Sequence, residues 1–290
     1  MDQKNRKRVR WLFKRLAPKE YEKSLQFRIH DLGFGYDPFG LEIESAMLGY
    51  LFARFLYAHW FHVESTGVEH VPEEGPALVT PNHSGVLPLD ALMIGVDLVT
   101  KMAKPRIMRA VADHFFGFLP FINTALYRCG EVVGARSNVE ELMKGGELLC
   151  LFPEGAKGTG KLFKERYQLR PFNVGFMELS LLYKVPVVPT AVIGAEEQYP
   201  MLHDVKPLAQ ALSLPYFPIT PFFPMLGPVG ILPLPTKYYL QYGEPFHFYR
   251  DYPPETVQDP EVIHMLAGKV QQQVEQMIEE GLGKRKRIFA

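Results

Sequence analysis

The sequence has only two cysteines in 290 residues, Cys129 and Cys150. This number is too small for a disulfide framework or a cysteine-based zinc site, so we expect a reducing compartment and no metal. The formal net charge is +0, which argues against attraction of the whole protein to nucleic acid. No internal repeat, low-complexity tract or secretory signal is visible either, and we expect a folded α/β protein with appendages.

The sequence also lacks an unbroken apolar run that could span a membrane. Residues 42–63 are apolar and spaced like a helix, but Glu44 and Arg54 interrupt them. Residues 207–236 carry no charged side chain in thirty positions, yet their eight prolines rule out a continuous spanning helix. We interpret 207–236 as an apolar flap that touches a membrane or roofs a lipid tunnel, with a proline-rich loop over the core as the alternative.

Charge is unevenly distributed despite the zero total, because both ends of the chain are basic. Four basic residues stand at 284–287. Near the start, apolar side chains such as Trp11 and Phe13 accompany seven basic ones, which are Lys4, Arg6, Lys7, Arg8, Arg10, Lys14 and Arg15. Such a segment is either a solvated tail or a helix that lies on anionic lipid. We therefore expect a peripheral or monotopic protein at the cytoplasmic face of a membrane.

Apolar β-branched runs alternate with segments of helical periodicity through the middle of the chain. Strands are predicted at residues 77–80, 147–152, 185–192 and 237–242, the last closing the sheet, and helices at residues 88–96, 138–144 and 173–183. The alternation predicts an α/β fold with a mainly parallel central sheet flanked by helices. Asp259 and Pro260 begin a C-terminal amphipathic helix whose apolar positions are Ile263, Leu266, Val270, Val274 and Met277.

These patterns divide the chain into three parts. Residues 1–62 form an N-terminal basic and helical arm that associates with a membrane. Residues 63–250 form the α/β domain, and residues 251–290 form the C-terminal helix and basic tail. We find no linker that would separate these parts into independent domains.

His83 ends an apolar run, and Asp90 follows it after six intervening residues. A carboxylate that fixes the tautomer of an imidazole lets the ring take a proton from a hydroxyl, so the two residues are a candidate catalytic dyad. On one continuous helix they would lie about 10 Å apart along the axis, beyond hydrogen-bond reach. Gly85 permits a detour, and Pro88 can restart the helix so that Asp90 faces back. A capped helix start or a satisfied polar pair is the alternative interpretation.

A second candidate site is the glycine-rich loop at residues 153–161, which carries Glu154, Gly155, Lys157 and Lys161. Glycines let backbone N–H groups approach an anion, and lysines add charge, so the loop suits a phosphate. Its spacing also fits a nucleotide P-loop, although Leu162 stands where a Ser or Thr would ligate magnesium. The chain has no Gly-x-Ser-x-Gly elbow, which disfavours a serine esterase.

Four motifs in order resemble those of the glycerolipid acyltransferase family, typified by lysophosphatidate (1-acylglycerol-3-phosphate) acyltransferases. They are His83 with Asp90, Gly130 with Arg136, Phe-Pro-Glu-Gly at 152–155 and Val-Pro-Val-Val-Pro at 185–189. The resemblance covers roughly residues 61–248. It departs from the family pattern at two places. The family's spacer between His and Asp has four residues, and Thr-Arg-Ser commonly follows the third motif where this chain has Ala-Lys-Gly at 156–158.

The resemblance implies an enzyme that moves a fatty acyl group from a thioester to the hydroxyl of a lysophospholipid or glycerol-phosphate acceptor. The donor would be acyl-CoA or acyl-carrier protein, with no bound cofactor. His83 would act as general base oriented by Asp90. The glycerol phosphate would be bound by Arg136, Glu154 and Gly155, with Lys157 or Lys161 as neighbouring candidates. A catalytically silent lipid- or membrane-binding protein on the same frame is the alternative, and the P-loop interpretation is the third.

Two further expectations concern the rest of the reaction path. Backbone N–H groups in residues 82–85 are candidates to stabilise the oxyanion that develops on the thioester carbon. Aromatic side chains could line the path of the acyl chain, although ordinary core packing is the simpler interpretation for them. They are Phe115, Phe116, Phe118 and Phe121.

Overall fold

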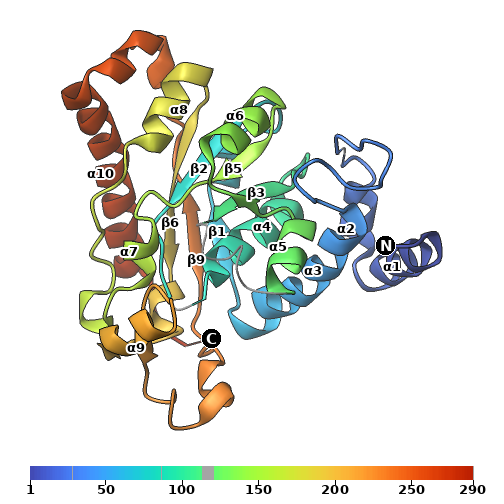
Figure 1. Cartoon of the computed structure of the whole chain (residues 1–290), viewed down its shortest axis with the longest axis horizontal. Helices are drawn as coiled ribbons and strands as arrows, with labels where there is room; N and C mark the ends of the chain where they lie inside the picture. The colour runs from blue at the N-terminus through green and yellow to red at the C-terminus, as the bar shows by residue number, and fades with distance from the viewer. Residues whose placement is uncertain (28, 86, 113–120, 290) are drawn as a thin grey trace.

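A seven-stranded sheet runs through the molecule (Figure 1). The computed structural model describes residues 1–27, 29–85, 87–112 and 121–289. The strands are β1 (Glu64–Thr66), β2 (Ala77–Pro81), β3 (Met108–Ala112), β4 (Val132–Val133), β5 (Leu148–Cys150), β6 (Val187–Ile193) and β9 (Tyr239–Tyr242). Their order in the sheet is β1-β9-β6-β2-β5-β3-β4. Neighbouring strands of this sheet are parallel except β6 and β9, so the predicted fold class is confirmed.

The buried centre of the sheet consists of β2, β5 and β6. Every residue of β2 and of β6 is buried, as expected for strands that are covered on both faces. Val79 of β2 pairs with Cys150 of β5 on one side and with Val188 of β6 on the other. Because these strands are parallel, the segments that follow β2 and β5 leave the sheet at the same edge. This shared edge positions the candidate site.

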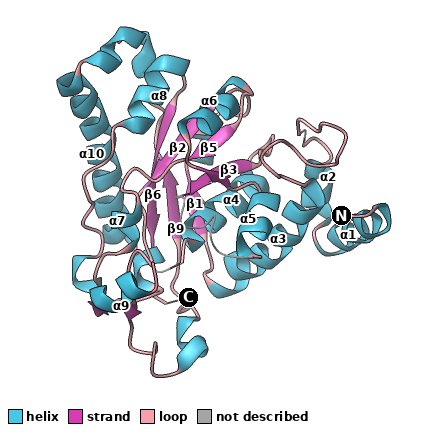
Figure 2. Ribbon diagram, viewed as in Figure 1, coloured by secondary structure: helices cyan, strands magenta, loops and turns pink. Residues whose placement is uncertain are grey.

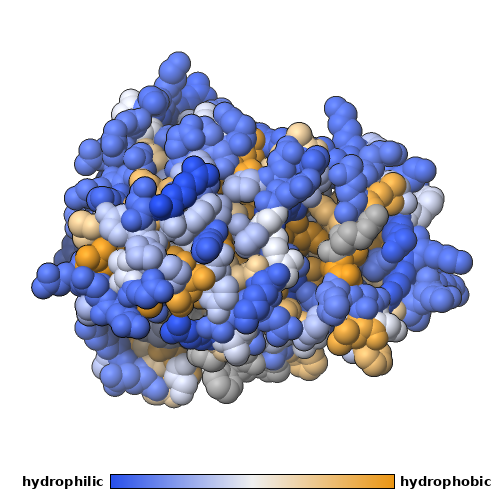
Figure 3. Space-filling view, turned by 90° about the horizontal axis from the view of Figure 1, so that it is seen from above, coloured by the Kyte–Doolittle hydropathy of each residue, from blue (hydrophilic) through white to orange (hydrophobic). Residues whose placement is uncertain are grey.

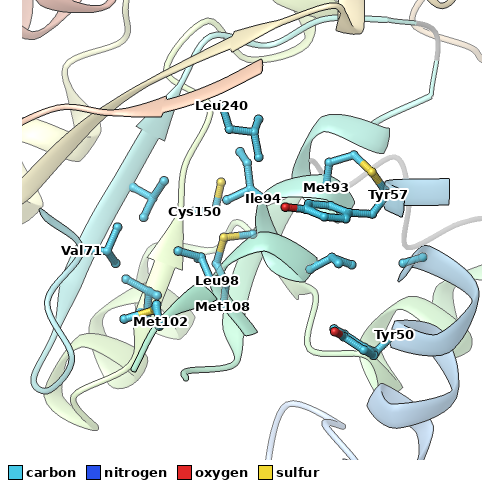
Figure 4. Close-up of a cluster of buried hydrophobic side chains, with 14 of the residues drawn as sticks. Tyr50, Tyr57, Val71, Met93, Ile94, Leu98, Met102, Met108, Cys150 and Leu240 are labelled. Atoms are coloured by element: carbon cyan, nitrogen blue, oxygen red, sulfur yellow. The ribbon is translucent and has the colours of Figure 1, made fainter. Parts of the chain in front are cut away.

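Helices cover both faces of the sheet (Figure 2). On one face, α3 (Ile43–Phe55) and α4 (Leu89–Lys101) close a core that includes Met93 and Leu98 (Figure 4). On the other face, a second core is closed by α6 (Arg136–Lys144), α8 (Gly175–Tyr183) and α10 (Pro260–Lys284). Shorter helices are α2 (Pro18–Ser24), α5 (Ile122–Arg128), α7 (Ala156–Thr159) and α9 (Lys206–Ala211).

The basic N-terminal segment is helical and packs on the domain. Helix α1 (Gln3–Leu16) places Phe13 edge-on against Tyr50 of α3, with ring centroids 5.6 Å apart. Nη2 of Arg6 lies 3.1 Å from Oε1 of the buried Glu42. The solvated-tail interpretation of this segment is therefore wrong for the residues that face α3. The outer side of the helix still exposes apolar side chains, among them Trp11 and Leu16.

The predicted elements differ from the observed ones in a few places. Residues 42–63 were expected to be one helix, but α3 gives way to a π-helical turn at Leu56–Trp60 and then to β1. Strand β9 does not close the sheet, because it lies between β6 and the three-residue edge strand β1. Strands β1, β3 and β4 were not predicted. The predicted C-terminal helix is confirmed as α10, whose N-cap Asp259 accepts hydrogen bonds from two backbone N–H groups.

Residues 207–236 form a lobe that stands away from the sheet at the bottom of Figure 1, and we call it the proline-rich lobe. It begins within α9 and includes β8 (Pro218–Ile219), which pairs with β7 (His203–Asp204), and a 3₁₀ helix at Gly227–Ile231. In the part of the chain that the structure describes, no helix is both long enough and apolar enough to cross a membrane.

Candidate active site

The structure brings His83 and Asp90 together. Nδ1 of His83 lies 2.8 Å from Oδ2 of Asp90. The Asp90 carboxylate is fully buried and also accepts hydrogen bonds from the backbone N–H groups of Ser84 (3.1 Å) and Ala91 (2.8 Å). A carboxylate can only accept, so Nδ1 donates and the ring keeps its lone pair on Nε2. The His83 side chain is 12% exposed.

The chain makes this contact by leaving regular structure between β2 and α4. Gly85 has φ of 86°, a left-handed conformation that residues with a Cβ rarely adopt. Helix α4 then begins at Leu89, with Pro88 as its N-cap and Asp90 in its first turn. The detour expected at Gly85 is therefore present, and it shortens a separation that a continuous helix would make too long. Val86 lies outside the described residues.

Glu154 ties the third motif to the dyad. One of its oxygens accepts the backbone N–H of His83 (2.9 Å), and the other accepts the backbone N–H of Arg170 (2.8 Å) and the ammonium of Lys161 (3.2 Å). Its side chain is fully buried. Three donors of the protein thus hold this buried carboxylate, and its predicted contact with substrate stays a prediction. Glu154 fixes the position of the His83 backbone.

Lys161 is likewise engaged within the protein. Its ammonium lies 3.2 Å from Oε2 of Glu154 and 2.9 Å from Oε1 of Glu196, and its side chain is 2% exposed. Burial is the largest influence on Glu196 and raises the pKa of its carboxyl, and the neighbouring Lys161 opposes that effect. Two carboxylates engage the Lys161 ammonium in this geometry, so nothing here supports its predicted contact with substrate, which stays a prediction. The same pairing removes the P-loop alternative, because a P-loop lysine must be free to reach phosphate.

Phe152 and Gly158 complete the packing around the imidazole. The Phe152 ring stacks on His83 with centroids 3.9 Å apart. Gly158 of α7 lies so close that an added Cβ would stand 2.9 Å from the Cβ of His83 and 2.9 Å from that of Glu154. Gly155 takes a positive φ of 58° just before α7. The glycines of this loop therefore allow its backbone to approach the dyad.

Lys157, unlike Lys161, has no ion-pair partner within the described residues. It is exposed and lines an open surface cleft, together with Gly160, Arg170, Asp204 and others. The guanidinium of Arg170 is paired with Glu165 at 2.8 Å. Helix α7 contributes Ala156 and Lys157 to the lining of this cleft and packs Gly158 against His83. The contact of Lys157 with a phosphate stays a prediction.

Arg136 is not brought to the dyad. It begins α6, just beyond β4, and its guanidinium contacts Glu140 (3.1 Å) and Glu178 (3.7 Å) while its side chain is 63% exposed. Strand β4 is separated from β2 by β5 and β3. Three strand spacings amount to about 14 Å, which exceeds a side-chain contact. In this geometry the predicted role of Arg136 in holding the same phosphate as the loop is not supported.

Backbone donors near His83 were expected to serve the oxyanion, but two of them are already used. The His83 N–H donates to Glu154 and the Ser84 N–H donates to Asp90. Sequence reasoning missed a pair of buried polar side chains beside this loop. Neither the hydroxyl of Ser84 nor the carboxamide of Gln198 has a hydrogen-bond partner within the described residues. A Cβ on Gly85 would lie 2.7 Å from Nε2 of Gln198, so the carboxamide borders the dyad loop.

The structure describes only one of the four phenylalanines that were considered for the path of the acyl chain. Phe115, Phe116 and Phe118 lie outside the described residues. Phe121 is 89% exposed, so the core-packing interpretation is wrong for it.

A family model described as Acyltransferase matches residues 62–193. An uncharacterized protein of Mycobacterium tuberculosis is 42% identical over 257 residues, which cover 88% of this chain and 70% of that protein. The chain belongs to the acyltransferase family. The matched range contains all four motifs, from His83 to Pro189, and the resemblance that those motifs carry is confirmed.

Two further likenesses are more distant. The Bos taurus protein named DGAT1/2-independent enzyme synthesizing storage lipids is 28% identical over 192 residues, covering 66% of this acyltransferase and 54% of that protein. The crystal structure of the 1-acyl-sn-glycerophosphate (LPA) acyltransferase PlsC from Thermotoga maritima superposes with a TM-score of 0.55 at 17% identity, covering 99% of this chain and 100% of that chain. At this low identity, the likeness to the PlsC structure shows a shared fold alone.

Proposed function

We propose that this acyltransferase moves a fatty acyl group from an acyl thioester to the hydroxyl of a lipid acceptor, with His83 as general base. The observation that carries the proposal is the contact between Nδ1 of His83 and the buried carboxylate of Asp90. It leaves Nε2 as the basic nitrogen at the edge of the sheet. A positioned imidazole of this kind contributes roughly 10² to 10⁴ to a rate.

The reaction proceeds by direct attack. Nε2 of His83 takes the proton of the acceptor hydroxyl while the hydroxyl oxygen bonds to the thioester carbonyl carbon. The resulting tetrahedral intermediate collapses, the C–S bond breaks, and the proton on His83 passes to the departing thiolate. Asp90 stabilises the imidazolium in between and holds the ring orientation, as the buried carboxylate of a serine-protease triad does. The protein needs neither a covalent acyl intermediate nor a bound cofactor for these steps.

The acceptor site is proposed to be the cleft beside α7. Lys157 offers a free ammonium there, whereas Lys161 is occupied by two carboxylates. A lysophospholipid or glycerol phosphate would place its phosphate on Lys157 and its hydroxyl toward His83. One lysine is a modest phosphate site, and a relative is named for storage lipids. A neutral acceptor is therefore the second candidate, and the two differ in their dependence on Lys157.

Lipid substrates imply that the protein works at a membrane surface. We place it on the cytoplasmic face of the membrane, without a segment that crosses the bilayer. Helix α1 supports this proposal, because Trp11 is 61% exposed and the guanidinium of Arg15 lies over its ring at 5.4 Å. Exposed aromatic and basic side chains on one helix are typical of a segment at a headgroup boundary. Acyl-CoA and acyl-carrier protein are both retained as donors.

The test is to measure acyl transfer by the purified protein over a panel of substrates. The donors are acyl-CoA and acyl-carrier protein, and the acceptors are lysophosphatidate, glycerol 3-phosphate and diacylglycerol. We expect transfer to at least one acceptor and a loss on the order of 10³ in His83→Ala. His264→Ala is the matched control, because His264 is an exposed imidazole on α10. Lys157→Gln should raise the KM of a phosphate-bearing acceptor about tenfold and leave that of diacylglycerol unchanged.

Two results would contradict the proposal. Equal turnover by the wild type and His83→Ala would remove the imidazole from the mechanism. Binding of the lipid acceptors without transfer from any thioester would support the catalytically silent alternative.

A further inference from the structure

The proline-rich lobe presents large apolar side chains to solvent at its tip. Met225 is 84% exposed, Val229 is 62% exposed and Leu232 is 63% exposed. Neither these residues nor any other in 207–236 carry a charge. Folded monomers rarely expose apolar side chains together in this way unless the surface contacts a partner or a membrane. The function proposed above does not account for this tip.

The lobe is attached to the body of the protein by hydrogen bonds at its base. Nε1 of Trp60 donates to the carbonyl of Pro233 (3.1 Å), and the backbone N–H of Leu234 donates to the carbonyl of Gln198 (2.9 Å). The hydroxyl of Thr236 donates to the carbonyl of Gly194 (2.9 Å). The exposed side chains are therefore displayed on an anchored structure.

The basic C-terminal tail lies against the same base. The backbone N–H of Lys237 donates to the carbonyl of Ile288 (2.8 Å), and Phe289 forms a β-bridge with Thr236. This attachment keeps residues 286–289 beside the lobe, and all four are exposed. Two of them are basic, Lys286 and Arg287, and two are apolar. The uncharged apolar lobe thus has a cationic neighbour at its base.

We propose that the proline-rich lobe and the tail dock together on an anionic lipid bilayer. The tip inserts Met225, Val229 and Leu232 among the acyl chains, and Lys286 and Arg287 contact headgroup phosphates. Apolar contact and attraction to anionic lipid are the two terms that hold peripheral proteins on membranes. A second copy of the chain fits less well, because 207–236 offers no acidic residue to pair with the tail and a two-fold axis would bring like charges together.

This contact is separate from the one proposed for α1, and it adjoins the cleft. At the base of the lobe, Oδ1 of Asp204 accepts the backbone N–H of Phe217 (2.9 Å). Asp204 and Pro215 also line the cleft that holds Lys157. Docking of the lobe therefore brings the mouth of the cleft to the lipid surface. Vesicle binding tests the proposal without relying on catalysis.

The experiment is cosedimentation of the full chain with phosphatidylglycerol–phosphatidylcholine vesicles and with pure phosphatidylcholine vesicles. The triple variant Met225→Ser, Val229→Ser and Leu232→Ser should bind both kinds at least about tenfold more weakly. Changing Lys286 and Arg287 to Gln should weaken binding about tenfold to the anionic vesicles only. Met265→Ser is the control, because Met265 is 45% exposed near the start of α10. That end of the molecule lies opposite the lobe, on a face that is mostly hydrophilic (Figure 3).

A fluorescence measurement locates the contact. In a Trp11→Phe background, which keeps Trp60, Val229→Trp should show more quenching by lipids brominated in the acyl chains than the background protein does, and Met265→Trp should show no added quenching. Absence of quenching at position 229, or unchanged vesicle binding by the triple variant, would overturn the proposal. So would a triple variant that splits an oligomer in light scattering but binds vesicles as the wild type does, since the lobe would then be an interface between copies.

Discussion

Three buried carboxylates, those of Asp90, Glu154 and Glu196, fix the positions and hydrogen bonds of the residues around the candidate site. Asp90 fixes the tautomer of His83, and Glu154 holds the His83 backbone. Glu154 and Glu196 together occupy Lys161, so that Lys157 is left free at the cleft. Each of these carboxylates has hydrogen-bond donors that offset the cost of its burial.

Glu131 is a carboxylate whose burial opposes its ionisation. Burial raises the pKa of Glu131 from 4.5 to about 7, and one of its oxygens has no hydrogen-bond partner within the described residues. The folded state therefore keeps a proton that the unfolded state releases between about pH 4.5 and 7. The contribution of Glu131 to stability consequently falls as the pH rises through that window.

Glu131→Gln should remove this loss. We expect the free energy of unfolding to rise by about 1 to 2 kcal/mol at pH 8 and to change little at pH 4.5, where the wild-type carboxyl is protonated in the folded state and about half protonated in the unfolded state. This gain in stability is smaller than the full pKa shift of Glu131 would give, because the side chain is only partly shielded from water. Urea denaturation at the two pH values measures it, with the exposed Glu279→Gln as control. An equal gain at both pH values would contradict the account.

Among the elements, the short helix α7 depends on Gly158. Its backbone lies against His83 and Glu154, so any side chain there must push α7 or the dyad loop aside. Gly268 offers a contrast in α10, because a Cβ added there would meet nothing within 4 Å.

Gly158→Ala should lower kcat by about tenfold or more, because small displacements of catalytic groups are costly. Gly268→Ala should leave kcat unchanged and raise the free energy of unfolding by about 0.5 to 1 kcal/mol, as expected for glycine replaced by alanine inside a helix. Steady-state kinetics and urea denaturation of the two variants measure both effects. Loss of activity in both variants, or in neither, would argue against a close fit of α7 on the dyad.

The longest elements that sequence patterns predicted have enough residues to show a period, although the three-residue β5 was predicted and the five-residue β3 was not. Strands β2 and β6 and helix α10 are long apolar or amphipathic segments with clear ends, and they were found. Strand β4 has two residues and β1 has three, so neither shows an alternation that can be read. Their places in the sheet follow from pairing with distant strands, which local sequence does not encode.

The same limit applies to the candidate site. The contact of His83 with Asp90 was expected from the order of the four motifs, with Gly85 permitting the detour, because the longer spacer alone left the geometry open. The partners of Lys161 are not both local, since Glu196 follows β6 and meets it only in the folded chain. The sequence analysis therefore assigned Lys161 to a phosphate, because it could not show that the distant Glu196 carboxylate binds the Lys161 ammonium.

For the molecule as a whole, the parallel strands bring two sequence-distant motifs to one edge of the sheet. His83 follows β2 and Glu154 follows β5, and their hydrogen bond joins the two loops. Both α1 and α10 contribute residues to the cores that close the faces of this sheet. The division at residues 62 and 250 stays a prediction about separate roles, with membrane contact assigned to the first part.

The central claim is that His83 and Asp90 act as one unit on the acceptor hydroxyl. It is tested most directly by a double-mutant cycle of kcat/KM with His83→Ala, Asp90→Asn and the double variant, using the donor and acceptor that the panel selects. We expect a loss on the order of 10³ for His83→Ala and no further loss when Asp90→Asn is added. Wild-type activity in His83→Ala, or losses that multiply in the double variant, would contradict the account.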